Sequence, residues 1–341
     1  MKIEEYIPLL RLTTMKTGGA ARYVVTASGE HEVKTAVQFA AEKKLPVIPL
    51  GAGSNMLAPD DGVEAVFMRM SDEIGIHRFE EVGGGIQILV SAGVPWDSFV
   101  DEAVSRGWWG IENLSGIPGT IGAAAVQNIG AYGMALSESV VEVFAYDLKE
   151  HALKTFSHRD CLFGYRTSVF KEERDRYFIA RIRFRLSTTA APRLSYRDIT
   201  EHFTDTNEEP SLLNIRHAVL AIRMKKFPPL DTYGTAGSFF MNPVLPEATA
   251  LTLKERFPGM PLFSMPEGGV KVPLAWILDR VLNMKGERVG GAFLWNQQPI
   301  VIATETGATT RDVLMLADRV RSLVKEKIHI DILPEVRTVF K

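Results

Sequence analysis

The sequence contains a single cysteine, Cys161, among 341 residues. One thiol cannot form an internal disulfide, and alone it cannot supply the ligands of a structural zinc site. The seven histidines show no spacing typical of a zinc-binding pair. We therefore expect no metal site, and a protein of a reducing compartment, the cytoplasm.

An excess of basic residues is also missing. The 39 Lys and Arg residues are balanced by 41 Asp and Glu residues, which gives a net charge of −2. Neutralisation of phosphates dominates affinity for nucleic acids, so this balance argues against a duplex-binding protein. No run approaches the roughly 20 apolar residues of a membrane span, and the first ten residues do not resemble a secretory signal. We expect small-molecule partners, no nucleic acid, no membrane, and a monomer.

The composition is that of a globular protein. Hydrophobic residues make up 46% of the chain and charged residues 23%, which excludes wholesale disorder. At roughly 150 residues per domain, the length predicts two or three domains.

The N-terminal part predicts a strand, a helix and a second strand. Residues 23–27 are β-branched and aromatic, Ser28 is a candidate N-cap, and residues 47–50 form a short apolar strand. The residues expected on one apolar helix face between them are Val33, Ala36, Val37, Ala40 and Ala41.

The middle of the chain is rich in predicted strands, at 66–70, 85–93, 140–148 and 176–186. In the last of these, arginines alternate with Phe178, Ala180, Ile182, Phe184 and Leu186, which is typical of a sheet with one solvated face. The remaining predictions are helices at 96–107, 274–282 and 310–326, strands at 299–305 and 328–340, and linkers at 187–193 and 205–211. The apolar stripe of the 310–326 helix comprises Val313, Leu316, Ala317, Val320 and Val324.

A glycine loop, Gly51 to Asn55, follows the strand at 47–50. Glycines let the main chain approach a ligand and direct its N–H groups at phosphate. Alone, this loop is equally compatible with a tight surface turn.

A second glycine segment is longer and more informative. Five glycines lie among the nineteen residues from Ser115 to Gly133, and each would weaken a helix by about 1 kcal/mol. Apolar residues at 117, 121, 126 and 129 argue against a disordered linker. We interpret the segment as main chain wrapped around a large flat cofactor and its pyrophosphate, and the absence of Gly-Lys-Ser/Thr excludes a P-loop.

Three further motifs carry candidate functional residues. They are FGYRTSVFK (163–171) with Tyr165 and Arg166, GTAGSFFMNPV (234–244) with Ser238, and PEVRTV (334–339) with Glu335 and Arg337. Taken singly, the arginine fits a solvated charge and the Glu-Arg pair a surface ion pair. Ser238 does not lie in a Gly-x-Ser-x-Gly hydrolase motif.

In this order, the motifs make the chain resemble the UDP-N-acetylenolpyruvoylglucosamine reductase (MurB) family from end to end. The resemblance begins at Thr17-Gly-Gly-Ala-Ala and also includes LGAGSN, the 115–133 segment, NQQP and PEVRTV. The RLSYRD segment with Tyr196 is similar to the family's type I branch, which carries a tyrosine loop over the substrate. The departures, Ala52 and Ala123 to Ala125, should be tolerated by main-chain contacts.

The resemblance implies an activity and a set of catalytic residues. The family reduces the enolpyruvyl double bond of UDP-N-acetylglucosamine enolpyruvate to give UDP-N-acetylmuramate for peptidoglycan, using NADPH and a tightly but non-covalently bound FAD. Ser238 then matches the proton donor to C2, while Arg166 and Glu335 match the groups that stabilise charge on the substrate carboxylate. Arginine can bind a carboxylate in two-pronged geometry, and Glu335 could donate a hydrogen bond only if burial kept it protonated.

The resemblance also implies binding residues. Those matched to the substrate are Tyr165, Tyr196, Lys226, Asn242 and Gln298. Those matched to FAD are Gly51, Ala52, Gly53, Ser54, Asn55, Ser115, Gly116, Ile117, Pro118, Gly119, Gly122, Ala123, Asn128, Gly130, Ala131, Tyr132 and Arg337.

The implied fold is α+β in three parts. Residues 1–70 with 329–341, and residues 71–210, would be two α+β domains that form an FAD-binding module of the PCMH type. Residues 211–328 would be an α+β substrate-binding domain.

Two alternatives stay open at this point. One is another FAD oxidoreductase of the same architecture, such as an alcohol oxidase; many of those tether FAD through a histidine, and neither glycine segment contains one. The other is a non-catalytic nucleotide-binding protein, against which the presence of Arg166, Ser238 and Glu335 together argues.

Overall fold

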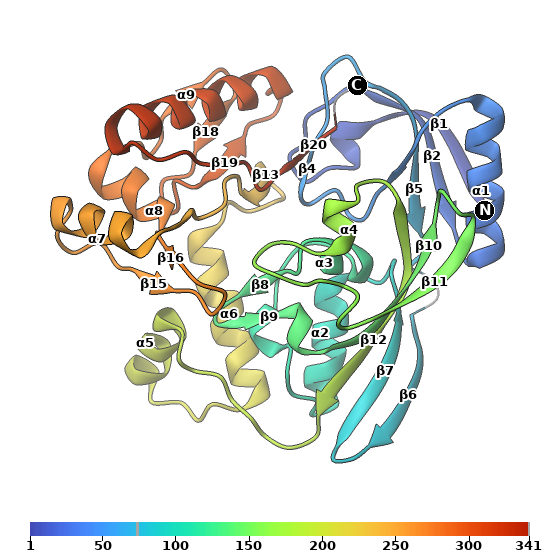
Figure 1. The fold of residues 1–341 in the computed structure, drawn as a ribbon, viewed down its shortest axis with the longest axis horizontal. Coiled ribbons are helices and arrows are strands. Elements are labelled where there is room, and N and C mark those ends of the chain that lie inside the picture. The colour runs from blue at the N-terminus through green and yellow to red at the C-terminus, as the bar shows by residue number, and fades with distance from the viewer. Residues whose placement is uncertain (73–74, 340–341) are drawn as a thin grey trace. The chain divides into compact units, whose positions relative to one another are not determined.

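The computed structural model describes residues 1–72 and 75–339, which form two compact units (Figure 1). Unit 1 comprises Met1–Ile7, Ala21–Gly53 and Glu64–Met224, and unit 2 comprises Pro8–Ala20, Ser54–Val63 and Lys225–Lys341. Both mix helices with strands, as expected for an α+β protein. The three-domain boundaries stay a prediction. No helix in the described part of the chain combines the length and apolarity needed to cross a bilayer.

Unit 1 contains two main sheets, of order β1-β2-β5-β3 and β11-β10-β12-β7-β6. Its strands are β1 Lys2–Pro8, β2 Ala20–Ala27, β3 Val47–Pro49, β5 Val63–Met70, β6 Ile76–Val82, β7 Gly85–Ser91, β8 Gly130–Ala131, β9 Met134–Ala135, β10 Val140–Asp147, β11 Ala152–Ser157 and β12 Tyr177–Ser187. Its helices are α1 Glu30–Lys43, α2 Trp96–Ser105, α3 Ile121–Val126, α4 Val169–Glu172, α5 Arg197–Thr206 and α6 Leu212–Lys226.

Unit 2 is built around a four-stranded sheet, β13-β19-β18-β17. Its strands are β4 Met56–Leu57, β13 Gly234–Ser238, β14 Val244–Leu245, β15 Phe263–Ser264, β16 Val270–Lys271, β17 Arg288–Val289, β18 Ala292–Leu294, β19 Val301–Thr304 and β20 Arg337–Thr338. Its helices are α7 Glu247–Arg256, α8 Leu274–Trp276, which continues as a π-helical turn at Ile277–Val281, and α9 Thr310–Ile328.

The predicted strand-helix-strand of the N-terminal part is confirmed as β2, α1 and β3. The buried side of α1 packs on β2 and β5, but Ala41 is exposed, so the predicted face is one residue too wide. The N-cap prediction for Ser28 is wrong, because Gly29 occupies that position. The Ser28 N–H instead donates to the Glu32 carboxylate at 2.7 Å.

Strand β12 departs from simple alternation. In its pairing with β10, Ala145 lies opposite Ile179 and Phe144 opposite Arg181, so Ala180 is an extra residue in a β-bulge. Phe178 therefore packs with α1, whereas Ile182 belongs to the core beneath α2 and α3. The prediction that these residues share one face is wrong, and the bulge lets a single strand contribute to two cores.

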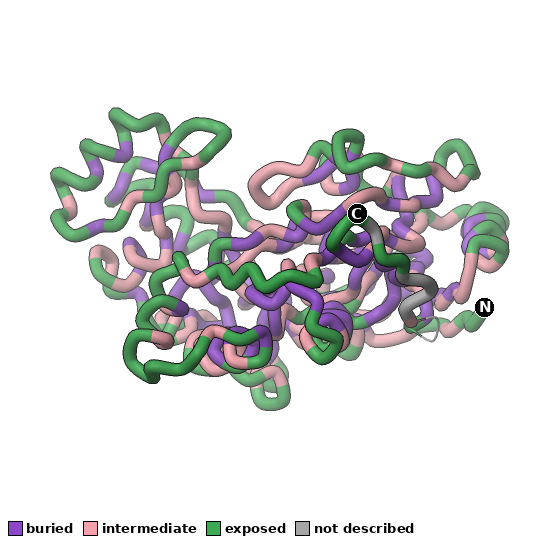
Figure 2. The backbone as a smooth tube through the Cα atoms, turned by 90° about the horizontal axis from the view of Figure 1, so that it is seen from below, coloured by how far each residue is buried: buried purple, intermediate pink, exposed green. Residues whose placement is uncertain are grey.

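The second core of unit 1 lies between the five-stranded sheet and the helices α2 and α3 (Figure 1). Helix α2 confirms the prediction at 96–107. The acidic segment at 205–211 is a linker only from 207, because α5 extends to Thr206, and the helix α6 that follows was not predicted. Buried residues run through the interior of both units (Figure 2).

Helix α9 confirms the prediction at 310–326. All five residues of its predicted apolar stripe are buried in the core of unit 2, which also contains residues of β18 and β19. Thr309 and Asp312 exchange hydrogen bonds in a capping box at its start, with Thr309 Oγ1 accepting from the Asp312 N–H at 3.1 Å.

The predicted strand at 328–340 is largely wrong. Ile328 ends α9, and only Arg337 and Thr338 form a strand, β20, while Phe340 lies outside the described residues. Burial still alternates, with Ile330 and Ile332 inside. The segment is thus extended on the core of unit 2, but among the described residues it pairs only through the two residues of β20 and an isolated bridge, Phe240 with Pro334.

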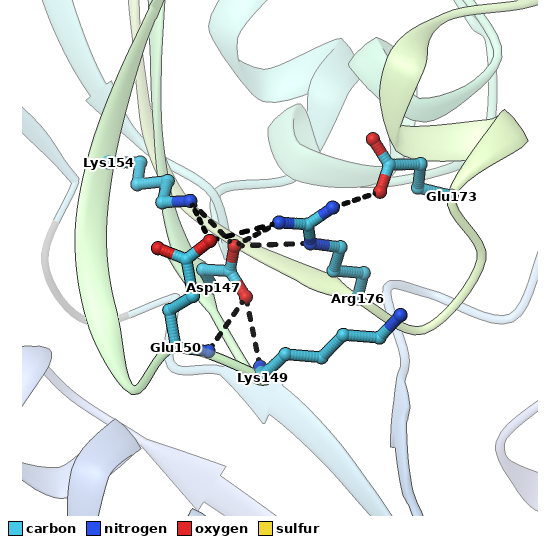
Figure 3. A network of polar contacts seen from close by, with 6 residues as sticks. All are labelled: Asp147, Lys149, Glu150, Lys154, Glu173 and Arg176. Carbon is cyan, nitrogen blue, oxygen red and sulfur yellow. Dashed lines mark hydrogen bonds and ion pairs between the residues drawn. The ribbon is translucent and has the colours of Figure 1, made fainter.

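A polar network closes the hairpin between β10 and β11 (Figure 3). The fully buried carboxylate of Asp147 accepts from Arg176 Nη2 at 3.0 Å and is 2.9 Å from Lys154 Nζ. It also accepts from the main-chain N–H groups of Lys149 and Glu150. Burial alone would raise the pKa of Asp147, but the bonds from Lys154, Glu150 and Arg176 outweigh it and hold the pKa below its usual value.

Asp147→Asn is expected to lower the free energy of unfolding by about 3 kcal/mol at pH 7, because two cations lose their buried counter-charge. A depressed folded-state pKa contributes stability above the unfolded pKa of about 3.9, and that stability is lost as the pH falls through the folded value. The difference between wild type and variant should therefore shrink below about pH 4. Urea unfolding of both proteins at pH 7 and pH 3 measures this difference in the free energy of unfolding. The exposed Asp205→Asn is the control, expected within about 0.5 kcal/mol of wild type; a pH-independent difference contradicts the charge argument.

Candidate functional site

The C-terminal motif lies beside the end of the first glycine loop in unit 2. Strand β20 pairs in parallel with β4, placing Arg337 opposite Met56. The Arg337 N–H donates to the Asn55 carbonyl at 3.1 Å, and Asn55 Nδ2 donates to the Glu335 carbonyl at 3.2 Å. Asn55 and Glu335, which are 280 positions apart in the sequence, thus join their two motifs by direct hydrogen bonding.

Main-chain contacts also bring Ser238 close to the C-terminal motif. Strand β13 ends at Ser238, and the next residue, Phe239, accepts at its carbonyl from the Glu335 N–H at 2.8 Å. Between Thr235 and Ser238 the register with β19 shifts by one residue. Gly237 lies in this bulge with φ +76°, a conformation that favours glycine. Because an extra residue reverses which face a side chain takes, the bulge decides the side of the sheet on which Ser238 lies.

The second glycine segment runs through unit 1 next to the first loop. It contains α3, capped by Thr120. A Cβ on Gly51 would lie 2.7 Å from Ala123 Cβ and 2.9 Å from Thr120 Oγ1, so only glycine permits this approach. The two segments that the sequence assigns to one cofactor are therefore in contact, which is the arrangement that a shared FAD-binding surface requires.

Several main-chain donors of the second segment are already used by the protein. Ser115 donates from both N–H and hydroxyl to the Glu112 carbonyl, and the Gly122 N–H donates to the Ala92 carbonyl at 3.0 Å. The Gly116 N–H donates to the Asp97 carboxylate. Any contact of these three residues with a cofactor therefore has to use other atoms than these donors.

The 163–168 segment packs against the second glycine segment. Arg166, half-buried and with φ +57°, donates from Nη2 to the Gly130 carbonyl at 2.7 Å. Asn128 Nδ2 donates to the Gly164 carbonyl at 3.1 Å. The guanidinium carbon of Arg166 is 5.7 Å from the centre of the Tyr165 ring. Both segments carry motifs that are recognisable in the sequence, and the structure brings them together.

Tyr132 and Tyr196 form an edge-to-face pair, with ring centroids 5.3 Å apart. Tyr132 is buried, and burial raises its pKa to about 12. Tyr196 is 40% exposed and is the N-cap residue of α5. Burial also raises the pKa of Tyr196. Both phenols are therefore protonated hydrogen-bond donors at neutral pH.

The other predicted substrate residues belong to unit 2. Asn242 Oδ1 accepts from the Leu274 N–H at 2.9 Å, so its oxygen holds the start of α8. Gln298 lies in the turn before β19, where its carbonyl accepts from the Val301 N–H. Lys226, half-buried, is the last residue of α6. Arg166, Tyr165 and Tyr196 belong to unit 1, and Ser238, Glu335 and Arg337 to unit 2.

Three charged residues around Gly116 were not predicted from the sequence: Asp97, Arg216 and Arg223. Arg223 Nε donates to the Gly116 carbonyl at 3.0 Å. Burial lowers the pKa of Arg223. The available signal was the seven-residue spacing of Arg216 and Arg223, which places both on one face of a helix, but α6 had not been recognised.

Comparison with known proteins gives matches over most of the chain. Residues 21–148 match the family model described as FAD binding domain, and residues 228–339 match UDP-N-acetylenolpyruvoylglucosamine reductase, C-terminal domain. The UDP-N-acetylenolpyruvoylglucosamine reductase of Pseudomonas aeruginosa is 34% identical over 98% of both chains. That of Chromobacterium violaceum is 39% identical over 85% of both. The crystal structure of the reductase of Thermus caldophilus has the same fold, with a TM-score of 0.69, 24% identity and 99% of each chain covered.

Proposed function

The chain belongs to the UDP-N-acetylenolpyruvoylglucosamine reductase family, and from this membership we infer that it reduces the enolpyruvyl double bond of UDP-N-acetylglucosamine enolpyruvate with NADPH. The product is UDP-N-acetylmuramate, a peptidoglycan precursor. The observation that carries the inference is the 34% identity to such a reductase over 98% of both chains. A cytoplasmic, monomeric enzyme is part of the proposal.

We propose that FAD is held by the two glycine segments and by Arg337. The close approach of Gly51 to the side chains of Ala123 and Thr120 fits this assignment, because it places the two glycine segments side by side. FAD held there would supply the hydride transfer from NADPH to C3 of the enolpyruvyl group. Main-chain groups of the first loop, Gly51 to Asn55, would bind its polar parts.

The remaining chemistry falls to the side chains of the protein. Addition of hydride at C3 moves charge onto C2 and the attached carboxylate, so C2 then needs a proton. We propose that the Ser238 hydroxyl donates this proton to C2. A hydroxyl is a weak acid in water, but a carbanion-like C2 is basic enough to take its proton.

We assign the stabilisation of charge on the substrate carboxylate to Arg166 and Glu335. The Arg166 guanidinium already uses Nη2 on the Gly130 carbonyl, which holds it beside the second glycine segment. Fixed orientation before substrate arrives lowers the reorganisation needed in the transition state. Substrate contacts are proposed for Tyr165, Tyr196, Lys226, Asn242 and Gln298.

Anaerobic stopped-flow of the two half-reactions tests the proposed function. The purified protein should show a flavin absorption band that NADPH bleaches and that UDP-N-acetylglucosamine enolpyruvate restores. A flavin band that NADPH bleaches but that only another acceptor restores would support a different FAD oxidoreductase. A colourless protein that takes up no FAD would support a nucleotide-binding protein without this activity.

Tyr196→Phe is expected to weaken substrate binding by about 0.5–3 kcal/mol, because it removes one phenol donor proposed to bind the substrate phosphates. The variant keeps the ring that packs against Tyr132, so FAD content should be unchanged. Substrate dissociation constants are measured by flavin fluorescence and FAD content by absorbance.

The exposed Tyr6→Phe on β1 is the matched control and should change neither quantity. Loss of FAD with unchanged substrate affinity would show that Tyr196 is a packing residue of unit 1 and not a substrate contact.

A further inference from the structure

An ion cluster in unit 1 joins α6 to α2. Arg216, 8% exposed, binds Asp97 through both terminal nitrogens, Nη1 to Oδ1 at 2.7 Å and Nη2 to Oδ2 at 3.0 Å. Its Nε is 3.0 Å from Asp101 Oδ1. Asp97 and Asp101 are one turn apart on α2, so a single arginine contacts both.

The Asp97 carboxylate has a third partner in the second glycine segment. Its Oδ1 accepts from the Gly116 N–H at 2.6 Å. Burial by itself would raise the pKa of Asp97, but the hydrogen bonds from Arg216 and the Gly116 N–H outweigh it and leave the pKa below its usual value. The carboxylate is therefore charged when it holds the loop, and its bonds are of the stronger, charge-assisted kind.

The carbonyl side of Gly116 is held by α6. Its carbonyl accepts from Arg223 Nε at 3.0 Å. A Cβ on Gly116, where φ is +69°, would lie 2.7 Å from Leu220 Cδ2. Residues 216, 220 and 223 are spaced by four and three, so one face of α6 covers this turn. Both polar main-chain groups of Gly116 are thus fixed by side chains, at the start of the segment assigned to FAD.

An ion pair that only ties two helices together would not need this third contact. Asp101 is the natural comparison, because it lies on α2 like Asp97 and pairs with Arg216, yet its side chain is 69% exposed. The contact that distinguishes the two aspartates is the hydrogen bond that Asp97 accepts from the Gly116 N–H.

We propose that Asp97, itself oriented by Arg216, is a positioning residue for the cofactor, holding the main chain from Gly116 to Gly119 in the conformation that binds FAD. The inference rests on the proposed function, since it takes FAD as the ligand of this segment. It adds residues that touch neither substrate nor cofactor but set the geometry of the loop that does.

The test compares Asp97→Asn with Asp101→Asn in the holoenzyme. An Asn at 97 can keep its oxygen on Gly116 only by turning its NH₂ group toward Arg216, where two donors would face each other. FAD dissociation is followed by the rise in flavin fluorescence on dilution, and thermal unfolding of each FAD-free protein is recorded separately. Asp97→Asn should raise the FAD dissociation constant about tenfold or more, while Asp101→Asn should leave it within about twofold of wild type.

Asp97→Ala should weaken FAD further, because it removes both the acceptor and the charge. Equal changes in FAD affinity for the variants at 97 and 101, or an unchanged dissociation constant in Asp97→Asn, would overturn the proposal. An Asp97→Asn protein that fails to fold would assign the residue to stability and also overturn it. A wild-type protein that binds no FAD would overturn the proposed function, and this inference with it.

Discussion

Ser238→Ala is expected to slow oxidation of the NADPH-reduced enzyme by substrate about 10²–10⁴-fold, the usual contribution of a general acid. Reduction by NADPH should stay near the wild-type rate, because no proton is delivered to C2 in that half-reaction. Anaerobic stopped-flow absorbance of the flavin measures the two rates separately.

The local structure makes this substitution a clean one. Ser238 is half-buried at the end of β13, and its position is set by the Gly237 bulge and by main-chain pairing with Val301. None of these features needs the hydroxyl. Alanine should therefore preserve the strand and remove only the proton donor.

Ser322→Ala, on an exposed position of α9, is the matched control and should leave both half-reactions unchanged. A Ser238→Ala enzyme with slow reduction by NADPH and normal oxidation by substrate would contradict the role of proton donor. Comparison of substrate dissociation constants separates loss of chemistry from loss of binding.

Elements with a strong local period could be predicted from the sequence. The apolar stripe of α9 repeats at helical spacing over five residues, and all five are buried. Strand β7 and the helix α2 were likewise recognisable, because each carries its own hydrophobic pattern. Such patterns depend only on neighbours along the chain.

Features set by contacts distant in the sequence could not be predicted. The bulge at Ala180 arises where β12 changes from one core to the other, and no residue type marks it. The C-terminal segment alternates like a strand, but its partners are short, so pairing stops after two residues. Alternation of apolar and polar residues indicates that one side of a segment is buried, but it does not indicate whether a partner strand is present.

In the candidate site, too, features with a local sequence pattern could be predicted and features set by distant contacts could not. The glycine segments were found because their composition is unusual for a helix or a strand. The charged residues around Gly116 were missed because Asp97 and Arg216 look like ordinary surface residues of two helices. Their significance depends on a contact across 119 positions in the sequence, which only the folded chain reveals.

The second large effect is expected for substitutions of Glu335. Its main chain is held independently of its side chain, since its N–H donates to the Phe239 carbonyl and its carbonyl accepts from Asn55 Nδ2. The half-buried carboxyl group can therefore be changed with the surrounding strand contacts left in place. A donor that stabilises charge on the substrate must also be protonated, and a glutamine mimics this state with an NH₂ group of similar shape.

Glu335→Ala is accordingly expected to slow oxidation of the reduced enzyme by substrate about 10²–10³-fold, the usual cost of removing one preorganised donor. Glu335→Gln should retain more of this rate than Glu335→Ala, because it keeps a donor at the same place, and reduction by NADPH should be unchanged in both. Stopped-flow of each half-reaction measures these rates, with Glu255→Gln and Glu255→Ala on the exposed side of α7 as matched controls. Because a glutamine cannot replace the charge of an ion pair but can replace a hydrogen-bond donor, the order of the two variants separates the two roles. Equal and mild losses in both would assign Glu335 to a structural ion pair.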